Sequence, residues 1–316
     1  MSKTGIVSDS RMTLHHPGAG HPEQPARITA VMNRLQDSGI AKELSVINPR
    51  LALDEELLLV HTAGYLQLVT REVDAGCEQL STGDADINEH SEEAARVATG
   101  CALAAVDAVF SSEVHNAFCA IRPPGHHASQ ARGMGFCLFN SVAVASRYAQ
   151  SVYGAEHVLI VDWDVHHGNG TQDVFYEDGS VLFFSTHQSP WYPGTGTASE
   201  TGEGKGHGCT INCPLPAGTG GDVVKGAFKE RLLPAVASFS PDLILLSAGF
   251  DSRIDDPLGR FRLTDNDFGE LTNMMTELAE KYCDGRLVSL LEGGYNLDGL
   301  ARAAETHVRA LSGKLR

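Results

Sequence analysis

The chain has 316 residues, of which 42% are hydrophobic and 20% charged, enough to bury the core of one large α/β domain or two smaller ones. Its formal net charge of −16 at pH 7 argues against nucleic-acid binding by the chain as a whole and would mildly attract cationic substrates. Acidic surfaces are also common in ordinary soluble proteins, so the charge alone identifies no partner.

Domain organisation and location are predicted from features that the sequence lacks. No linker-like tract, internal repeat or low-complexity run divides it, so we expect a single domain over residues 1–316. Residues 1–11 show no targeting pattern, and no run approaches the roughly 18 apolar residues of a membrane span. The seven cysteines are scattered, which argues against a disulfide framework. We therefore expect a cytoplasmic protein without a membrane partner, and the sequence leaves open whether it forms a homo-oligomer.

Short apolar runs alternate with longer amphipathic segments along the chain. In the first half of the chain we predict a strand at 5–8, helices at 27–38, from 54 through 60 and at Ser91–Phe110, a strand at 117–121 and a helix at Ser141–Tyr153. In the second half we predict strands at 158–161, 181–185 and 210–212, a helix at 222–239, a strand at 243–246, a helix at 266–282 and a strand at Leu287–Leu291. The long, Gly-rich segment 186–207 is typical of a functional loop. Helices interleaved with buried strands predict an α/β fold, in which an open, mostly parallel sheet has helices on both faces.

Four of the predicted strands lead into residue types that metal binding or proton transfer requires. The segments that follow them are 122–127 (RPPGHH), 162–170 (DWDVHHGNG), 247–251 (SAGFD) and 292–295 (EGGY). In open α/β sheets the ligand crevice lies outside the carboxyl ends of the strands, so these side chains should converge there. The convergence predicts an enzyme, and specifically a metalloenzyme, with its active site at that edge.

Three residues of these segments form a candidate metal site. Asp164 and His166 are two residues apart and can face the same way at a strand's end, and Asp251 can reach them from a neighbouring strand. Three protein ligands and an open position for water are the usual arrangement of catalytic zinc. An isolated Asp-x-His pair more often caps a helix, but the neighbouring His-His pairs and the Gly-Gly-Tyr segment favour the metal.

The adjacent histidines His126 and His127 follow two prolines and a glycine, which restrict the local backbone. A neutral imidazole needs a partner on its second nitrogen to fix its tautomer, and Asp162 and Asn169 are candidates for that partner. The alternative is a pair of buried structural histidines. His167 is interpreted as structural, because His166 already occupies the metal-facing direction.

These motifs together resemble the histone deacetylase family of the arginase–deacetylase superfamily, and most closely its class II branch. The resemblance runs from about residues 21–23 to the last helix and rests on six ordered motifs, namely segments 122–128, 133–140, 162–170, 192–196, 247–251 and 291–295. It implies the arginase–deacetylase fold and one Zn²⁺ bound by Asp164, His166 and Asp251. The implied reaction is hydrolysis of an acylated lysine side chain by metal-activated water.

The same resemblance implies roles for five further residues. His127 would be the general base toward water and later the acid for the leaving amine. Its partner is Asn169, a class II feature where class I relatives carry Asp, and His126 would pair with Asp162 as an electrostatic partner. Tyr295 would donate its hydroxyl to the developing oxyanion.

Two structural potassium sites are also implied by the resemblance. The residues matched to the first site are Asp162, Asp164, His166, Ser185 and Thr186. Those matched to part of the second site are Phe175, Asp178 and Val181. Zinc and potassium are therefore the expected cofactors.

A binuclear metal site of the arginase type is not expected. That pattern requires a carboxylate four residues after Asp164 and another two residues after Asp251, and these places hold Gly168 and Arg253. A second metal would therefore lack ligands.

The substrate is predicted from the tunnel that the family's pattern implies. Its expected lining and substrate-binding residues are Gly135, Phe136, Tyr192, Leu258 and Gly293. Tyr192 stands where most relatives have Phe, and Leu258 stands where acetylpolyamine-specific relatives of class II have Glu. The expected partners are therefore acylated lysine peptides or proteins, with acetylpolyamines as an alternative that the acidic residues Asp84 and Asp86 could favour. A non-catalytic acyl-lysine-binding protein of the same fold is a further alternative, although no motif residue needed for turnover is missing.

Overall fold

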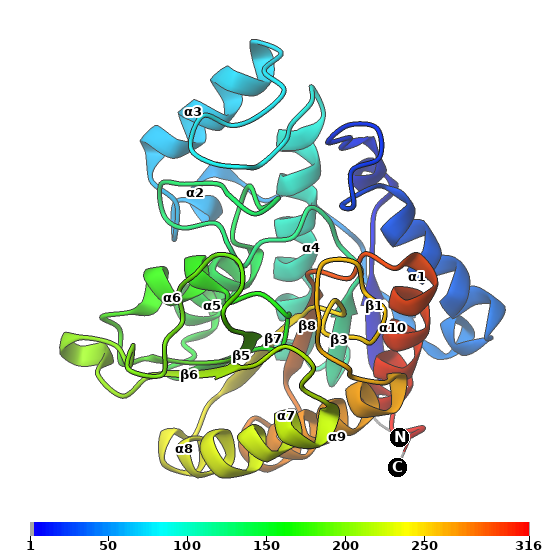
Figure 1. Cartoon of the computed structure of the whole chain (residues 1–316), viewed down its shortest axis with the longest axis vertical. Helices are drawn as coiled ribbons and strands as arrows, with labels where there is room; N and C mark the ends of the chain where they lie inside the picture. The colour runs from blue at the N-terminus through cyan, green and yellow to red at the C-terminus, as the bar shows by residue number, and fades with distance from the viewer. Residues whose placement is uncertain (1–2, 316) are drawn as a thin grey trace.

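The computed structural model describes residues 3–315 and contains one eight-stranded sheet in the order β2-β1-β3-β8-β7-β4-β5-β6 (Figure 1). The strands are β1 (Thr4–Val7), β2 (Ser45–Val46), β3 (Asn116–Cys119), β4 (Val158–Asp162), β5 (Val181–Gln188), β6 (Thr210–Leu215), β7 (Leu243–Ala248) and β8 (Leu287–Leu291). Every pairing between neighbouring strands in the described residues is parallel. The predicted open parallel sheet is confirmed.

Helices cover both faces of the sheet. They are α1 (Ala26–Asp37), α2 (Asp54–Leu57), α3 (Ala63–Asp74), α4 (Ser91–Phe110), α5 (Ser141–Tyr153), α6 (Asn169–Phe175), α7 (Gly221–Ala227), α8 (Leu233–Phe239), α9 (Asp265–Tyr282) and α10 (Leu297–Leu311). Alternate residues of β7 separate into two cores: Leu243 and Leu245 pack on the side of α3, α4 and α5, whereas Ile244 and Leu246 pack on the side of α1, α9 and α10. The strands read as continuous apolar runs because both of their faces are buried.

Some element boundaries differ from the prediction, and each difference has a local cause. The predicted helix from residue 54 is only one turn, because the chain leaves it and restarts at α3, where the Thr62 side chain accepts the Tyr65 N–H and caps the new helix. The predicted helix at 222–239 is α7 and α8 joined by a π-helical turn at Phe228–Leu232. Strand β2 pairs with β1 at the sheet edge and is too short to give a periodic signal.

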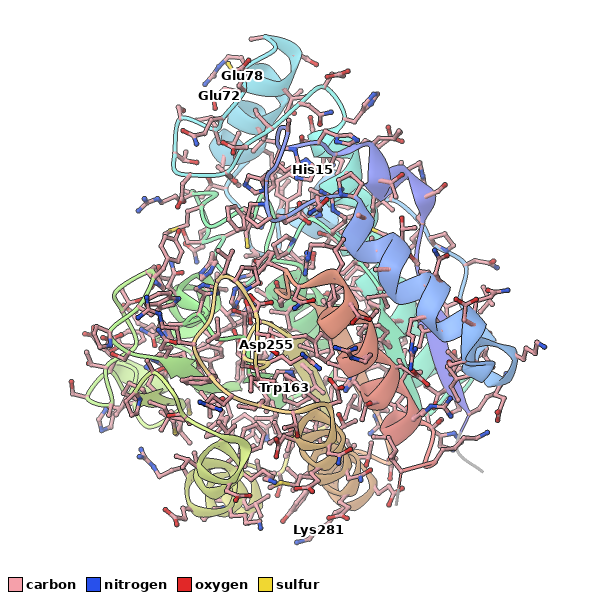
Figure 2. The ribbon with its side chains drawn as sticks, turned by 45° about the vertical axis from the view of Figure 1, so that its right-hand side comes forward. His15, Glu72, Glu78, Trp163, Asp255 and Lys281 are labelled. Atoms are coloured by element: carbon pink, nitrogen blue, oxygen red, sulfur yellow. The ribbon has the colours of Figure 1, made fainter. Side chains whose placement is uncertain are left out.

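The four central strands β3, β8, β7 and β4 are those whose following segments carry the polar motifs. In the register of the sheet, Asp162 at the end of β4 lies beside Ser247 of β7, and Ser247 lies beside Leu290 of β8. The four following segments therefore leave the same edge of the sheet. Figure 2 shows Trp163, which directly follows β4, in the interior and Lys281 of α9 at the outer surface. Among the described helices, none is both long and apolar enough to cross a membrane.

Candidate active site

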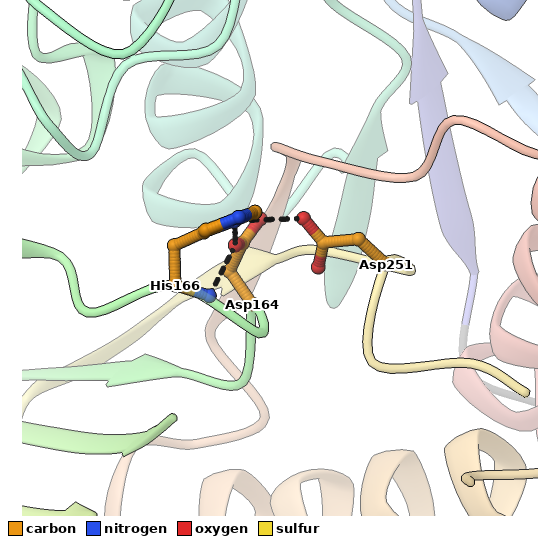
Figure 3. Close-up of side chains that lie close together, drawn as sticks. All are labelled: Asp164, His166 and Asp251. Atoms are coloured by element: carbon orange, nitrogen blue, oxygen red, sulfur yellow. Dashed lines mark hydrogen bonds and ion pairs between the residues drawn. The ribbon is translucent and has the colours of Figure 1, made fainter. Parts of the chain in front are cut away.

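Asp164, His166 and Asp251 come together at the carboxyl edge of the sheet, as Figure 3 shows. One potential ligand atom from each residue lies within 4.8 Å of the others, and all three residues are buried. His166 Nδ1 lies 3.0 Å from Asp164 Oδ1 and 3.2 Å from Asp251 Oδ2. The loops after β4 and β7 supply these side chains, as the spacing of the sequence predicts.

The electrostatics of this cluster are those of a cation site. Burial, together with the charge of Asp164, raises the pKa of Asp251 to about 7. Burial opposes protonation of His166, but Asp164 and Asp251 outweigh it and raise its pKa to about 10. Asp251 Oδ2 is buried and has no well-aligned hydrogen-bond partner among the described residues. A buried carboxylate oxygen without a well-aligned donor is costly, so a bound metal fits this donor set.

Backbone amides orient the carboxylates of the cluster. The Val165 N–H donates to Asp251 Oδ1 at 2.8 Å, and the Gly293 N–H donates to Asp164 Oδ2 at 2.8 Å. A Cβ atom on Gly293 would lie 2.0 Å from Asp251 Oδ2, so only glycine allows this approach. Gly293 was predicted to bind substrate, but the structure places it against the carboxylates and not among the residues that line the cavity.

His126 and His127 lie side by side with their ring centroids 4.0 Å apart, and each ring has the partner that the sequence predicts. His126 Nδ1 lies 2.8 Å from Asp162 Oδ2, and His127 Nδ1 lies 2.8 Å from Asn169 Oδ1. The Asn169 amide group donates to Met134 Sδ at 3.5 Å, which directs its Oδ1 toward His127. His127 Nδ1 therefore carries a proton toward Asn169, and Nε2 keeps a free lone pair.

The two histidines differ in charge because their surroundings differ. Burial lowers the pKa of His127 well below its usual range, and the positive charges of His126 and His166 lower it further. Burial also opposes protonation of His126, but the charges of Asp162 and Asp164 raise its pKa well above the usual range. At neutral pH His127 is thus a neutral proton acceptor beside a positively charged His126.

A cavity of about 240 Å³ opens onto these residues. It is lined by Asp84, His127, Gly135, Phe136, His166, Trp191, Tyr192, Leu258 and Tyr295. Four of the five predicted substrate-binding residues therefore line one cavity. Asp84 and Trp191 also line it, although neither was predicted to bind substrate. Trp191 belongs to the long loop predicted to be functional, and its Nε1–H donates to the Leu258 carbonyl at 2.9 Å.

Tyr295 lines this cavity, as His127 and His166 do, and is mostly buried. Its ring packs edge-on against Phe136 at 6.0 Å, and the Arg27 guanidinium lies 5.0 Å from its centroid. Burial raises the pKa of the Tyr295 hydroxyl well above its usual range, so it keeps its proton. Within the described residues this hydroxyl makes no hydrogen bond, which leaves it free to donate to a ligand.

Two buried carboxylates, Glu292 and Asp256, support the site, and neither was predicted from the sequence to have a role in it. Glu292 accepts the Gly125 N–H at 2.6 Å, the His126 N–H at 3.2 Å and the Ser247 hydroxyl at 3.1 Å, so it holds the turn that carries the histidine pair. Its position directly after β8 was a usable signal, because a charged residue at the end of a buried strand needs partners.

Asp256 is the second of these carboxylates. It accepts the Tyr295 N–H at 2.7 Å, the Asn296 N–H at 3.2 Å and the Leu258 N–H at 2.9 Å. The loop that carries Leu258 is thereby tied to the backbone of Tyr295. The Arg27 guanidinium from α1 donates a hydrogen bond to the carbonyl of Gly294, the residue before Tyr295, at 2.7 Å.

The residues matched to potassium lie in two places. In the sheet, Asp162 of β4 lies beside Ser185 of β5. All residues matched to the first potassium site are buried, namely Asp162, Asp164, His166, Ser185 and Thr186. The second set, Phe175, Asp178 and Val181, spans the end of α6 and the start of β5, where the Asp178 N–H donates to the Phe175 carbonyl at 3.0 Å.

Two further sequence interpretations agree with the geometry. Both ring nitrogens of His167 are used by the neighbouring side chains of Thr195 and Gln172, at 2.8 and 3.0 Å, as befits a structural residue. Arg253, at the place of a second arginase-type carboxylate, pairs with Asp265 at 2.6 Å. The described residues contain one group that could hold a metal, Asp164, His166 and Asp251.

Comparisons with known proteins agree with this site. The sequence matches the histone deacetylase domain over residues 21–311. It is 41% identical to a probable deacetylase of Archaeoglobus fulgidus, over 94% of this chain and 82% of that protein. It is 42% identical to a histone deacetylase-like amidohydrolase of Pseudomonas aeruginosa, over 88% of this chain and 73% of that protein. The crystal structure of the HDA15 HD domain has a TM-score of 0.93 at 39% identity, over 99% of this chain and 88% of that chain. The chain therefore belongs to the histone deacetylase family of hydrolases and has the arginase–deacetylase fold.

Proposed function

We propose that this protein is a zinc-dependent amidohydrolase of the class II type that removes acetyl or related acyl groups from lysine side chains. The observation that carries the proposal is the arrangement around one narrow cavity. The cavity is lined by His166 of the three-residue metal cluster, by the neutral imidazole of His127 with its free nitrogen, and by Tyr295 with its unpaired hydroxyl. Amide hydrolysis needs these groups: a Lewis acid, a base for water and a donor for the oxyanion.

Zn²⁺ held by Asp164, His166 and Asp251 would supply the Lewis acid that polarises the scissile carbonyl and activates water. In our proposal, His127 takes a proton from water at its Nε2 atom and later returns it to the leaving amine. Asn169 keeps the opposite ring nitrogen protonated, so that the lone pair of His127 faces the cavity. His126, charged and paired with Asp162, adds a positive potential beside the developing negative charge.

The remaining features of the site concern the substrate and the surroundings. Phe136 and Tyr192 offer aromatic walls to an alkyl chain, and Leu258 gives the mouth an apolar residue where a polyamine's distant ammonium would need an anion. We further propose that potassium occupies the two places described above. We also propose that residues 1–316 act as one catalytic domain in the cytoplasm.

The decisive experiment is a panel of acyl-lysine peptides, N-acetylputrescine and acetylspermidine, assayed with the zinc-loaded protein and after chelation. We expect hydrolysis of acetyl-lysine peptides that stops with chelation and returns with zinc. A higher kcat/KM for the acetylpolyamines would favour the alternative substrate class. Tight binding of acyl-lysine without turnover by zinc-loaded protein would indicate the non-catalytic alternative.

Replacing Leu258 by glutamate should shift the preference toward acetylpolyamines. Opposite charges about 4 Å apart attract by roughly 1–4 kcal/mol at a wet protein surface, and about 1.4 kcal/mol is a factor of ten. We therefore expect the kcat/KM ratio of acetylspermidine to acetyl-lysine peptide to rise by about tenfold. Leu58→Glu, at an exposed leucine outside the cavity lining, is the matched control and should leave the ratio unchanged. An unchanged ratio in Leu258→Glu would show that Leu258 does not face the far end of the substrate.

Zinc binding by the metal-free protein should release a proton and tighten as the pH rises. His166 is protonated up to a pKa of about 10, because its two carboxylate neighbours outweigh the effect of burial, whereas Asp251 loses its proton with a pKa of about 7. A ligand must be deprotonated to bind a metal, so the zinc Kd should fall about tenfold per unit between about pH 7 and pH 9. Competition against a chelator and calorimetry in two buffers would measure this dependence. A Kd that does not change with pH would exclude His166 as a ligand.

A further inference from the structure

Two residues that line the cavity, Tyr192 and Asp84, are joined by a hydrogen bond from the tyrosine hydroxyl. This hydroxyl donates to Asp84 Oδ1 at 3.0 Å, and the same oxygen accepts the Gly135 N–H at 2.8 Å. Gly135 is followed directly by Phe136, which lines the same cavity as Tyr192 and forms its second aromatic wall. One carboxylate oxygen therefore joins the two walls of the tunnel, although Asp84 and Tyr192 are 108 residues apart in sequence.

The Phe136 wall stands on a turn that needs support. Gly135 has φ +57° and Phe136 has φ +68°, so two consecutive residues adopt the left-handed conformation. That conformation is costly for a bulky residue and persists only where neighbouring contacts impose it. The Asp84 bond to Gly135 is one such contact. Thr82 adds two more, because its hydroxyl donates to the Gly133 carbonyl and accepts the Gly133 N–H, each at 3.1 Å.

The Tyr192 wall is held from other directions. Trp191 bonds to the Leu258 carbonyl, and Thr195 bonds to the ring of His167. The Tyr192 ring stands edge-on to His127, with centroids 5.2 Å apart. Within the part of the chain that the structure describes, the hydroxyl of Tyr192 makes the one hydrogen bond between loop 189–196 and the loops at 81–86 and 132–136.

We propose that the Tyr192 hydroxyl and Asp84 form a latch that fixes the width of the tunnel, which makes Tyr192 a specificity-determining residue for acylamides of unbranched alkyl amines. The inference rests on the proposed function, since it concerns which amine can carry the acyl group. A methylene chain fits between two aromatic rings held at a set separation. A thicker amine, such as one built on a saturated cyclohexane ring, would require the walls to move apart and the latch to break.

The charge state of the pair suits this role. Burial raises the pKa of the Tyr192 hydroxyl, and the negative charge of Asp84 raises it further, so the hydroxyl keeps the proton that it donates. A hydrogen bond to an ionised acceptor is stronger than one between neutral groups. The Tyr192→Phe variant keeps the aromatic ring and loses only the hydrogen bond to Asp84.

The test compares two peptides that differ only in the width of the acylated side chain. One carries acetyl-lysine, and the other carries trans-4-(acetamidomethyl)cyclohexylalanine, which has the same acetamide on a saturated cyclohexane ring. We expect wild type to prefer the lysine peptide and Tyr192→Phe to reduce that preference in kcat/KM by about three- to tenfold. Tyr153→Phe is the matched control, because the Tyr153 hydroxyl also donates to an aspartate, Asp107 at 2.8 Å, outside the cavity lining. It should leave the preference unchanged.

Variants of Asp84 separate the latch from a direct charge effect on substrate. Asp84→Asn keeps an oxygen that can accept the tyrosine proton and should retain most of the preference, whereas Asp84→Ala should lose it as Tyr192→Phe does. The double variant Tyr192→Phe with Asp84→Ala should be no worse than Asp84→Ala alone, because both remove one interaction. Melting curves and zinc content would show that each variant is folded and loaded.

Two results would overturn the latch. The first is an unchanged preference in a folded, active Tyr192→Phe variant. The second is a loss in Asp84→Asn as large as in Asp84→Ala, which would indicate that Asp84 acts through its charge on the substrate. Absence of acyl-lysine hydrolysis in zinc-loaded wild type would instead contradict the proposed function, so the two failures are distinguishable.

Discussion

Replacing Asp251 by asparagine should remove bound zinc and acyl-lysine hydrolysis while leaving the metal-free fold about as stable as that of the wild type. Asp251 is one of the three residues that could hold the metal, and a neutral amide is a poorer ligand than a carboxylate. Metal catalysis contributes several kcal/mol to the barrier, so we expect kcat/KM to fall by about 1,000-fold or more. Elemental analysis and the acetyl-lysine assay would measure the two losses.

The stability half of this prediction follows from the electrostatics of the cluster. The amide oxygen can still accept the Val165 N–H, and the volume of the side chain is unchanged. The pKa of Asp251 is raised from the ordinary value of an aspartate to about 7. The folded state therefore loses stability as the pH rises from that ordinary pKa to about 7, because the carboxylate becomes ionised in a buried place. Asparagine lacks this penalty. His166 loses an anionic neighbour, which acts in the opposite direction. The free energy of unfolding of the metal-free protein at pH 8 should therefore change by less than about 1 kcal/mol.

Two variants serve as comparisons for Asp251→Asn. His166→Ala should also lose zinc, since it removes a second ligand of the same cluster. Asp298→Asn, at an exposed aspartate of α10, makes the same chemical change away from the site and should keep both zinc and activity. Zinc near one per chain in Asp251→Asn, together with normal turnover, would be incompatible with the proposed ligand set.

The parts of this fold that the sequence predicts are those set by burial. Segment 243–246 is apolar without interruption because β7 is covered on both faces, and the same holds for 158–161 in β4. Once such strands are parallel and central, the rule that ligands bind at their carboxyl ends brings Asp164 and Asp251 together, although they are far apart in sequence. The cluster of Asp164, His166 and Asp251 is therefore predictable from the sequence.

The supporting contacts were not predictable in the same way, because they depend on the relative placement of loops. Glu292 and Asp256 accept backbone N–H groups from segments that only the folded chain brings near. Their side chains carry no pattern that names these partners. The bond between Asp84 and Tyr192 is of the same kind, since both lie on loops without periodicity. Each residue carries its own signal in the sequence, since Asp84 is an acidic residue that could favour a cationic substrate and Tyr192 stands where most relatives have phenylalanine.

Replacing Tyr295 by phenylalanine should reduce the turnover of acetyl-lysine by about 10²–10³-fold, the usual cost of removing one oxyanion donor. The ring should stay in place, because its contacts with Phe136 and Arg27 do not use the hydroxyl. Zinc content should also be unchanged, since Tyr295 is not among the residues of the metal cluster. A bond made only in the transition state affects kcat and kcat/KM together and leaves KM nearly constant.

A more electrophilic acyl group provides the control for this role. A trifluoroacetyl-lysine peptide stabilises its own oxyanion, so Tyr295→Phe should slow its hydrolysis much less than that of the acetyl-lysine peptide. Tyr153→Phe removes a hydroxyl on the surface and should affect neither substrate. Equal losses on the acetyl and trifluoroacetyl peptides would show that Tyr295 positions the substrate. A large difference between them would show that its hydroxyl stabilises negative charge, the role that its unpaired, protonated state in the lining of the cavity favours.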